Sequence, residues 1–391
     1  MISVRNTCSG RRYDVRLRDP NGRVYNRTFT TRKEAQTFAA REEADRSRGS
    51  WVDPRRGTVT VGQWATQWIA QRPELRPRTV ELYRGLLDRH ILPELGSVEM
   101  AKLSPSQVRS WYARLRGTAG PGASTAAKAY RLLRAILRTA VADEVVVRNP
   151  CQVERAGVER APERPVATVA EVEALANAVA PRLRALVLLA AWCGLRRGEL
   201  LALRRRDVNL LRSTVRVERA VQQMANGTLI FGDPKSDAGR RTVAVPPHVI
   251  PDLVDHLEHY TCADPDSLVF TGEKGGPLRP HVLQKAWVAA KAATGLPQFH
   301  LHDLRHSGNT WAAATGASTK ELMARMGHAN SEAAIRYQHA TADRDQVIAH
   351  ALSDLATPAP VIPIARTADR PRDERAMDDP QTRSKGARKR P

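Results

Sequence analysis

Hydrophobic and polar residues alternate near the start of the chain. Between residues 11 and 18, Tyr13, Val15 and Leu17 alternate with charged residues, which is the two-residue period of a strand with one buried face. A second such run occupies residues 24–29, after an Asp-Pro-Asn-Gly turn signal. The pattern predicts a small antiparallel sheet.

A helix is expected directly after this sheet. Thr31 and Glu34 have the spacing of a capping box, in which each side chain bonds the backbone N–H of the other residue. Ala35 and Phe38 then begin an apolar stripe. We therefore expect residues 1–55 to form a three-stranded sheet with one helix.

The polar face of the second strand carries Arg12, Arg16 and Arg18. One interpretation is a solvated surface, and the other is a sheet that lies on DNA. Three arginines on one face are more than solubility requires, which favours the DNA interpretation.

Residues 58–150 change to a helical spacing. Trp64 and Trp68, four apart, mark one helix, and Pro77 begins a second that continues through Ile91. Ser104 caps a third helix. A fourth helix opens at Ser124 after a glycine-rich loop. The basic residues expected on the outer faces, along a phosphate backbone, are Arg78, Arg84, Lys128, Arg131, Arg134 and Arg138.

Prolines and charges interrupt residues 151–166, which we interpret as a linker. Thr168 and Glu171 form another capping box, which begins a helix-rich domain over residues 165–355. Strands are expected within it at residues 214–219, 228–231 and 241–245, with turns at residues 226–227 and 237–239. The fold class is thus mainly α with small antiparallel β elements. Residues 357–391 are rich in Pro, Arg and Asp and are expected to be a disordered basic tail.

Composition indicates the kind of partner the protein binds and the cellular compartment in which it works. The 391 residues carry 62 Lys and Arg against 41 Asp and Glu, a net charge of +21, which indicates a polyanionic partner. The alternative explanation for this positive charge is a genome whose base composition favours Arg codons. The four cysteines are far apart, which argues against a zinc finger or a disulfide framework. We expect a cytoplasmic protein, because no signal peptide or membrane-spanning run of about 18 apolar residues is visible.

Arg196 stands in Gly-Leu-Arg-Arg-Gly-Glu-Leu, immediately after an apolar helix that Gly194 ends. A guanidinium held rigidly at such a junction can bind two phosphate oxygens. It can also pair with a carboxylate such as Glu199, and the two arrangements are compatible.

His302 and Arg305 are three residues apart at the start of a helix, so they share one face. The nearby His300 and His306 also suggest a metal site. No acidic or cysteine ligand has the usual spacing, so we expect neither a metal nor another cofactor.

Two further residues complete a candidate site. Gly327-His328 precedes Tyr337 by nine residues, and Lys235 lies on a loop between two strands. A tyrosine with a pKa near 10 needs a strongly cationic environment to act as a nucleophile. Taken alone, Tyr337 would be a core residue and Lys235 a solvated one.

In combination and order, these motifs resemble the tyrosine recombinase (phage integrase) family. The resemblance covers residues 165–350 by motif and implies metal- and ATP-independent cutting and rejoining of DNA. It implies that Arg196 and Arg305 hold the scissile phosphate and that Tyr337 forms a 3′-phosphotyrosyl link. Lys235 would protonate the departing 5′ oxygen, His302 would assist proton transfer, and His328 would bond the phosphate.

The resemblance extends to the other parts by order and pattern. Residues 58–150 are similar to the core-binding domain of the family, and residues 1–55 to its arm-binding domain. The implied partners are double-stranded DNA at core and arm sites, three further copies in a homotetramer, a host DNA-bending protein and a directionality factor. The implied role is integration and excision of a mobile element in the nucleoid of a bacterial host.

Two classes compete with a recombinase. A DNA-binding regulator would keep the fold without catalysis, but every catalytic position is filled. A topoisomerase would share the chemistry, but it has no use for an arm-binding domain.

One departure from the family is the polar run of residues 307–310, where small apolar residues are usual. A last amphipathic helix at residues 343–355 would dock on a neighbouring protomer or on its own domain.

Overall fold

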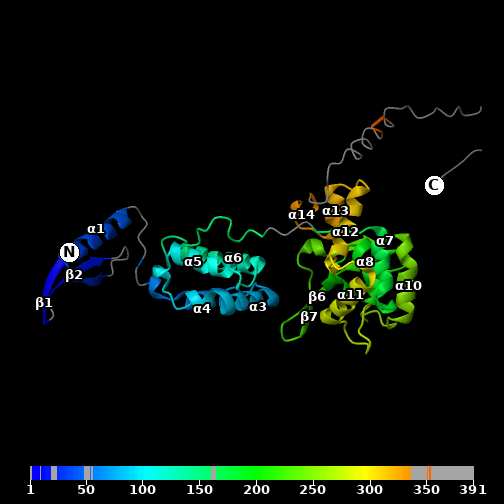
Figure 1. Cartoon of the computed structure of the whole chain (residues 1–391), viewed down its shortest axis with the longest axis horizontal. Helices are drawn as coiled ribbons and strands as arrows, with labels where there is room; N and C mark the ends of the chain where they lie inside the picture. The colour runs from blue at the N-terminus through cyan, green and yellow to red at the C-terminus, as the bar shows by residue number, and fades with distance from the viewer. Residues whose placement is uncertain are drawn as a thin grey trace, which may run out of the picture. The chain divides into compact units, whose positions relative to one another are not determined.

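The computed structural model describes residues 2–8, 10–18, 24–47, 53, 56–159, 164–335, 350 and 352–353 (Figure 1). The expected turn at residues 19–22, the expected nucleophile Tyr337 and the expected basic tail at residues 357–391 lie outside the described residues. So does the expected helix at residues 343–355, apart from residues 350, 352 and 353. The described residues confirm a mainly helical fold with small antiparallel sheets.

The N-terminal part is a three-stranded antiparallel sheet covered on one face by a helix. Its strands β1 (Ile2–Thr7), β2 (Gly10–Arg18) and β3 (Val24–Phe29) are paired in that order, and α1 (Arg32–Ser47) packs on them. Val15 and Ala35 are fully buried between sheet and helix. The Thr31–Glu34 capping box is confirmed, with 3.2 Å between each backbone nitrogen and the other residue's side-chain oxygen.

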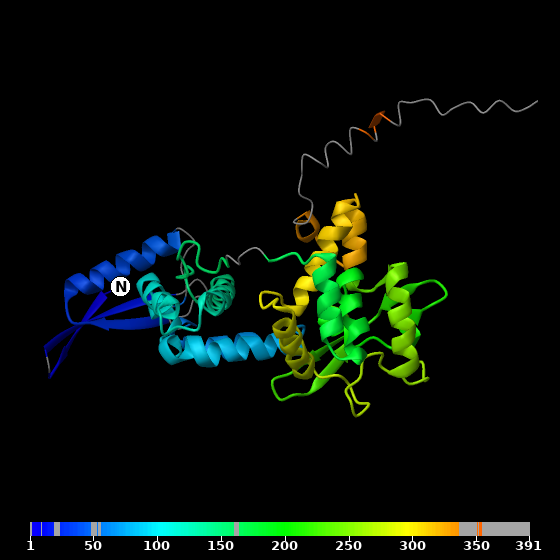
Figure 2. The ribbon, with the colours of Figure 1, turned by 45° about the vertical axis from the view of Figure 1, so that its right-hand side comes forward.

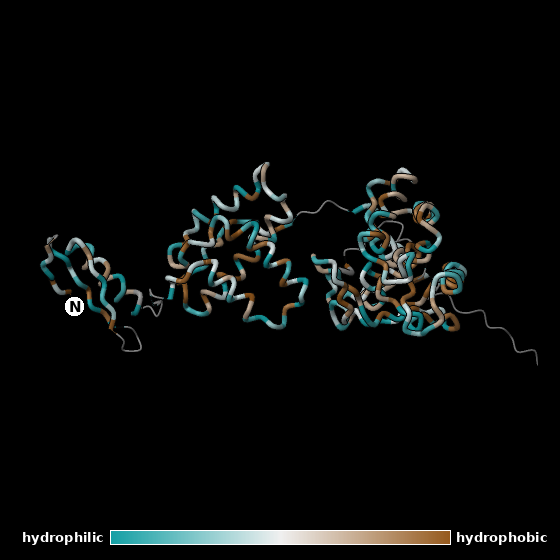
Figure 3. The backbone as a smooth tube through the Cα atoms, turned by 90° about the horizontal axis from the view of Figure 1, so that it is seen from below, coloured by the Kyte–Doolittle hydropathy of each residue, from teal (hydrophilic) through white to brown (hydrophobic). Residues whose placement is uncertain are grey.

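The helical part that follows has a core of its own. Its helices are α2 (Val61–Ala70), α3 (Pro77–Leu86), α4 (Leu92–Leu95), α5 (Pro105–Arg116) and α6 (Ala123–Ala142). Fully buried Trp111, Tyr130 and Leu133 lie at its centre. The tube in Figure 3 changes between brown and teal along the helices, as expected where each has one buried face.

The helix predicted from Pro77 through Ile91 is not a regular α-helix. It changes after Leu86 to a π-helical turn, η2 (Leu87–Ile91), before α4 begins. Pro93 has no N–H to donate to the backbone one α-helical turn earlier, so the regular bonding pattern cannot pass it. Leu87 and Ile91, at the two ends of this turn, are both buried in the core.

The linker predicted at residues 151–166 does not begin at 151. Cys151 is buried in the core of the helical part, and Val153 and Ala156 pack against that core. The N–H of Val153 donates to the Tyr130 hydroxyl at 2.8 Å. These apolar residues follow no regular period, so a search for periodicity cannot detect them.

The third part is built around α8 (Pro181–Trp192), whose residues Leu186 and Leu189 are fully buried. It contacts α12 (Leu301–Ala314) and α7 (Val169–Ala178), and more narrowly α10 (Ile250–His259) (Figures 1 and 2). The remaining helices are α9 (Arg197–Leu200), α11 (Pro280–Thr294), α13 (Thr319–Met326) and α14 (Glu332–Ile335). The described residues of this part also form three short 3-10 turns, which are η4 (Arg205–Asp207), η5 (Asp237–Gly239) and η6 (Pro247–Val249). Two more are described in the helical part before it, η1 (Arg56–Thr58) and η3 (Met100–Lys102).

The strands of this part form two sheets. One contains β4 (Val208–Asn209), β5 (Thr214–Val217) and β8 (Arg241–Ala244), and the other is the hairpin of β6 (Ala220–Gln223) and β7 (Leu229–Gly232). The strand predicted at residues 214–219 is present as β5, but it ends at Val217, because Glu218 and Arg219 lead the chain into the other sheet.

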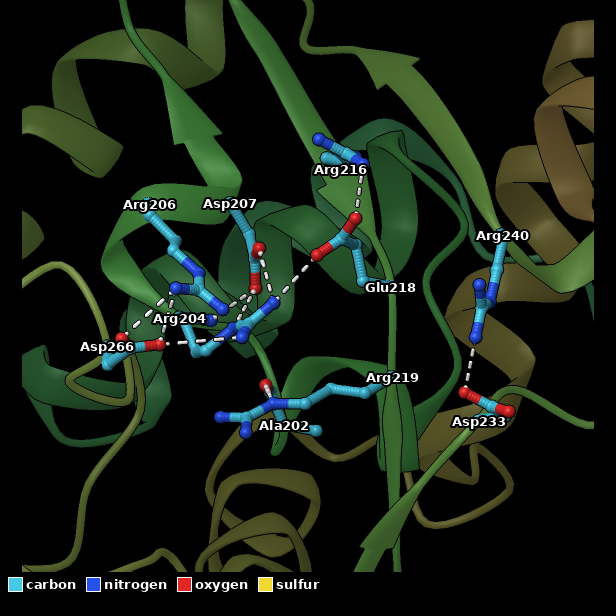
Figure 4. A network of polar contacts seen from close by, with 10 residues as sticks. All are labelled: Ala202, Arg204, Arg206, Asp207, Arg216, Glu218, Arg219, Asp233, Arg240 and Asp266. Atoms are coloured by element: carbon cyan, nitrogen blue, oxygen red, sulfur yellow. Dashed lines mark hydrogen bonds and ion pairs between the residues drawn. The ribbon is translucent and has the colours of Figure 1, made fainter.

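Glu218 and Arg219 are held at the point where the chain changes sheet (Figure 4). Arg204, 8% exposed, binds Glu218 at 2.8 Å and forks onto both oxygens of Asp207 at 3.1 Å. Arg219 donates to the carbonyl of Ala202 at 2.8 Å. These bonds fix the bend between β5 and β6 against the helical core.

Candidate active site

Arg196 lies at the N-cap of α9, just beyond the end of α8. Gly194 makes the sharp junction possible, because its φ of 61° is a left-handed conformation that favours glycine. The Arg196 N–H donates to one Glu199 oxygen at 2.9 Å, and its Nη1 donates to the other at 2.7 Å. Nη2 donates to the carbonyl of Gly327 at 3.0 Å. The pairing with Glu199 thus leaves the Arg196 side chain 32% exposed, so it stays accessible to a ligand.

Arg305 is in the first turns of α12 and is 4% exposed. Its guanidinium donates to the carbonyls of Gly194 and Met326, where α8 and α13 end. Its Nη2 lies 3.2 Å from Nε2 of His328. Arg305 is therefore held among the same segments that position Arg196.

His328 follows Gly327, which ends α13 in a left-handed conformation with φ of 63°. Burial, followed by the charges of Arg305, Arg196 and Arg241, lowers the pKa of His328 to about 4. The imidazole is therefore neutral at pH 7, and it can accept a hydrogen bond from Arg305.

His302 is in the first turn of the helix that carries Arg305, and it is exposed. Desolvation by its surroundings, followed by the charge of Arg305, lowers its pKa. Between these residues, Asp303 is 1% exposed and accepts the His300 N–H at 2.7 Å, which caps the helix. Asp303 also pairs with Arg164 at 3.2 Å.

Lys235 is exposed on the loop between β7 and β8, as the sequence predicted for its place between two strands. The structure thus brings Arg196, Arg305 and His328 together around residues 326–328, with His302 on the helix of Arg305. Tyr337 lies outside the described residues, nine positions after His328.

Arg241 is a site residue that the motifs did not reveal. Its side chain is 5% exposed, and its Nη2 donates to Glu199 at 2.9 Å. Glu199 therefore binds Arg196 and Arg241 at once. The only local signal was the position of Arg241 at the start of a predicted strand.

The site carries more positive than negative charge. Burial alone would raise the pKa of Glu199, but hydrogen bonding and the charge of Arg241, with the N–H and charge of Arg196, lower it. One carboxylate thus stands against the guanidinium groups of Arg196, Arg241 and Arg305. Such an arrangement suits an anion with several oxygens, such as a phosphate diester.

Ser307, Gly308 and Asn309, which follow Arg305 on α12, are all buried, and each makes different contacts. Ser307 is fully buried, accepts the Ala167 N–H at 2.8 Å and donates to the Asp303 carbonyl at 2.9 Å. Gly308 lets α12 approach α8 so closely that a Cβ atom there would overlap the Ala191 carbonyl oxygen. Asn309 is 1% exposed, and within the described ranges its amide has no hydrogen-bond partner. The Ser307 hydroxyl is therefore satisfied within the packed core, whereas the Asn309 amide is buried there without a bond in the described residues.

The residues proposed to contact DNA outside this site are mostly at the surface. Lys128, Arg131, Arg134 and Arg138 form one exposed row on α6. Arg131 is paired with Glu159, and on α3 Arg78 is paired with Glu81. The contact of these residues with a phosphate backbone stays a prediction, and their acidic partners could not be identified from the sequence.

On the N-terminal sheet, Arg16 and Arg18 are exposed and Arg12 is partly buried. Arg5 lies opposite Arg12 on β1, so a fourth arginine shares this face. Asp14 pairs with Arg5 at 3.3 Å and reduces the positive charge of the face.

The described residues contain neither a metal-binding cluster nor a membrane-spanning helix. No group of three or more His, Cys, Asp or Glu side chains in those ranges is arranged to hold a metal ion. No helix in the described part of the chain is long and apolar enough to cross a membrane.

Comparison with known proteins decides the family. Residues 166–344 match the phage integrase family, and residues 60–116 match the N-terminal SAM-like domain of phage integrases. The prophage phiRv2 integrase of Mycobacterium tuberculosis is 40% identical over 365 residues, which cover 90% of this chain and 95% of that protein. The chain belongs to the phage integrase family. This integrase is a tyrosine-type site-specific recombinase, as the motifs predicted.

Solved structures of other recombinases have the same fold as this integrase. The Tn1549 transposon integrase, solved with a circular intermediate DNA, matches with a TM-score of 0.66 at 20% identity, over 75% of this chain and 99% of that one. The lambda integrase, solved as a tetramer on a Holliday junction, matches with a TM-score of 0.54 at 18% identity, over 84% and 96%.

Proposed function

We propose that this recombinase cuts and rejoins DNA strands through a 3′-phosphotyrosyl bond on Tyr337. The observation that carries the proposal is the convergence of Arg196, Arg305 and His328 on residues 326–328, nine residues before a tyrosine. This arrangement provides fixed donors for a phosphate close in sequence to a nucleophile.

Each group has one task in the cleavage step. The Tyr337 oxygen attacks phosphorus, the bond from phosphorus to the 5′ oxygen breaks, and its electron pair leaves with that oxygen. Lys235 gives a proton to the 5′ oxygen, and His302 takes the proton of the tyrosine. The lowered pKa of His302 keeps it unprotonated near pH 7 and able to do so.

Arg196 and Arg305 hold the nonbridging oxygens, where negative charge builds up in the transition state, and His328 bonds the same phosphate. Fixed donors lower that barrier because they need no reorganisation during the reaction. The phosphotyrosyl bond keeps the energy of the broken phosphodiester. A free 5′-hydroxyl of the partner strand can therefore rejoin the strand by the reverse step without ATP.

The wider assembly follows from the same proposal. The chain binds double-stranded DNA through its catalytic part and through the exposed basic residues of residues 58–150, while residues 1–55 bind separate arm sites. Four copies act together, as in the lambda integrase tetramer. Excision, a host DNA-bending protein, a directionality factor and a location in the nucleoid complete the proposal.

A trapping experiment tests the function. The protein and its Tyr337→Phe variant are incubated in EDTA with sheared DNA of the source genome, quenched with detergent, and the attached DNA is sequenced. We expect covalently attached DNA from one site with the unchanged protein and none with the variant, at equal DNA binding. Attachment that survives in the variant would exclude Tyr337 as the nucleophile. Loss of attachment only when EDTA is present would exclude a metal-free mechanism.

A further inference from the structure

Arg241 is buried beneath the candidate active site, at the C-terminal end of the loop that carries Lys235. It is the first residue of β8, and its side chain is 5% exposed. A buried guanidinium is costly unless its donors are used. Here Nη2 donates to Glu199 at 2.9 Å, Nε donates to the Arg325 carbonyl at 2.8 Å, and Nη1 donates to the Gly239 carbonyl at 3.1 Å.

These three acceptors belong to three different parts of the site. Glu199 is on the helix that Arg196 caps, and Arg325 is in the last turn of α13, just before His328. Gly239 is in the loop of Lys235. One side chain therefore ties this loop to both of the other segments.

The loop is also in direct contact with the turn that carries His328. A Cβ atom added at Gly327 would lie 2.7 Å from the Ala238 carbonyl oxygen, 3.0 Å from Arg241 Nη1 and 3.2 Å from Gly239 Cα. The turn and the loop thus leave no space for a side chain between them.

Strand pairing alone does not hold this loop in place. Within the described residues, β7 pairs only with β6, whereas β8 pairs with β5 in the other sheet. The loop joins two sheets that share no strand. Its position relative to His328 must come from other bonds, and the three of Arg241 join it to the segments that carry Arg196 and His328.

We propose that Arg241 is a positioning residue for Lys235, which fixes the Lys235 loop against the His328 turn so that the ammonium group reaches the departing 5′ oxygen. The inference rests on the proposed role of Lys235 as the proton donor. Removing Arg241 leaves both bonds between Arg196 and Glu199 in place. The loss therefore falls on protonation of the leaving group and not on the phosphate clamp.

Sulfur in place of the bridging 5′ oxygen separates these two roles. A thiol has a pKa near 8.5, so a thiolate leaves without the proton that an alkoxide requires. When the bond from phosphorus to sulfur breaks, the electron pair leaves with sulfur. A defect in proton donation is then rescued, whereas a defect in binding the phosphate charge remains.

The experiment compares single-turnover cleavage of the oxygen and sulfur substrates, built on the DNA site that trapping identifies. The full-length protein is used with the variants Arg241→Ala, Lys235→Ala and Arg196→Ala. On the oxygen substrate, we expect Lys235→Ala and Arg241→Ala each to be slower by about 100-fold. On the sulfur substrate, both should return close to the unchanged rate, while Arg196→Ala should stay slow on both substrates.

Two further variants keep the result interpretable. Arg241→Lys retains the charge beside Glu199, and hence the fold, but cannot reach three acceptors, so a smaller loss with the same sulfur rescue is expected. Arg212→Ala removes an exposed arginine from the same part of the chain and should cleave both substrates normally.

The outcomes distinguish the two proposals. If Lys235→Ala is rescued by sulfur but neither Arg241 variant is, Arg241 does not position Lys235, and the inference is overturned. If Lys235→Ala itself is not rescued, Lys235 is not the proton donor, and that part of the proposed function fails first.

Discussion

Nη2 of Arg305 lies 3.2 Å from Nε2 of His328, so two of the residues proposed to bind the phosphate contact each other directly. An arginine can only donate, so Nε2 accepts, and the ring of His328 is neutral. This agrees with the pKa of about 4 that burial and the neighbouring arginines give the group.

The neutral His328 predicts how stability changes with pH. Its pKa is lowered from 6.5 in the unfolded chain to about 4 in the folded protein, so between these values the unfolded chain binds the extra proton. The free energy of unfolding should therefore fall as the pH drops through this range. His328→Gln should make that decline shallower, as measured by thermal melting between pH 7 and pH 5.

His281→Gln provides the control, because His281 is an exposed histidine on α11. It should follow the unchanged protein at every pH. An equally steep decline in His328→Gln and in the unchanged protein would show that His328 does not contribute.

The two arginines of the site should differ in what their loss affects. Arg196→Ala should slow cleavage by about 100-fold while changing DNA affinity little, because the donor acts mainly in the transition state. Arg305→Ala should slow cleavage similarly and also lower the melting temperature, because Arg305 is 4% exposed and bonds the ends of α8 and α13.

The exposed neighbour Arg197 is the matched control for both variants. Arg197→Ala should leave melting and cleavage near normal. Equal losses of affinity and cleavage in Arg196→Ala would mean that Arg196 only binds DNA.

Gly308 should tolerate no side chain. Alanine there would push α12 away from the Ala191 carbonyl of α8, and such overpacking costs about 1–3 kcal/mol or more. Gly276→Ala is the control, because Gly276 has open space around its Cα and no positive φ. Chemical denaturation measures both variants, and equal stability would refute the close packing of α8 on α12.

Removal of residues 1–55 tests the arm-binding proposal. The shortened protein should still cleave an isolated core site, because the residues of the candidate active site all lie after residue 190. It should fail to recombine a full attachment site that contains arm sequences. Full recombination by the shortened protein would refute a second DNA site on the N-terminal sheet.

Features whose interacting residues lie close together in the sequence could be predicted. The capping boxes predicted at Thr31 and Thr168 and the helix cap predicted at Ser104 are present, because the residues that form each of them lie within three positions of one another. The Arg196, His302, Arg305 and His328 motifs were visible for the same reason, since each motif is a short run of residues.

Features that depend on distant partners could not be predicted. Arg241 binds Glu199 and Arg325, 42 and 84 residues away, and no local pattern marks such a pair. The end of β5 at Val217 could not be predicted either, because Glu218 just after it is bound by Arg204, which lies outside that run. Cys151 packs on the helical core without any regular spacing, so the expected linker began too early.

The bonds of Ser307 and Asp303 have a practical consequence for the design of chimeric recombinases. Ser307 binds Ala167, and Asp303 binds Arg164, so both of these residues are attached to the helix that carries His302 and Arg305. Both lie before Thr168, the cap of the first helix of the catalytic part. A fusion junction placed at Thr168 would remove both attachments. A new DNA-binding module should therefore be joined before Arg164. The transplanted catalytic part then keeps residues 164–167, whose bonds hold its active-site helix in place.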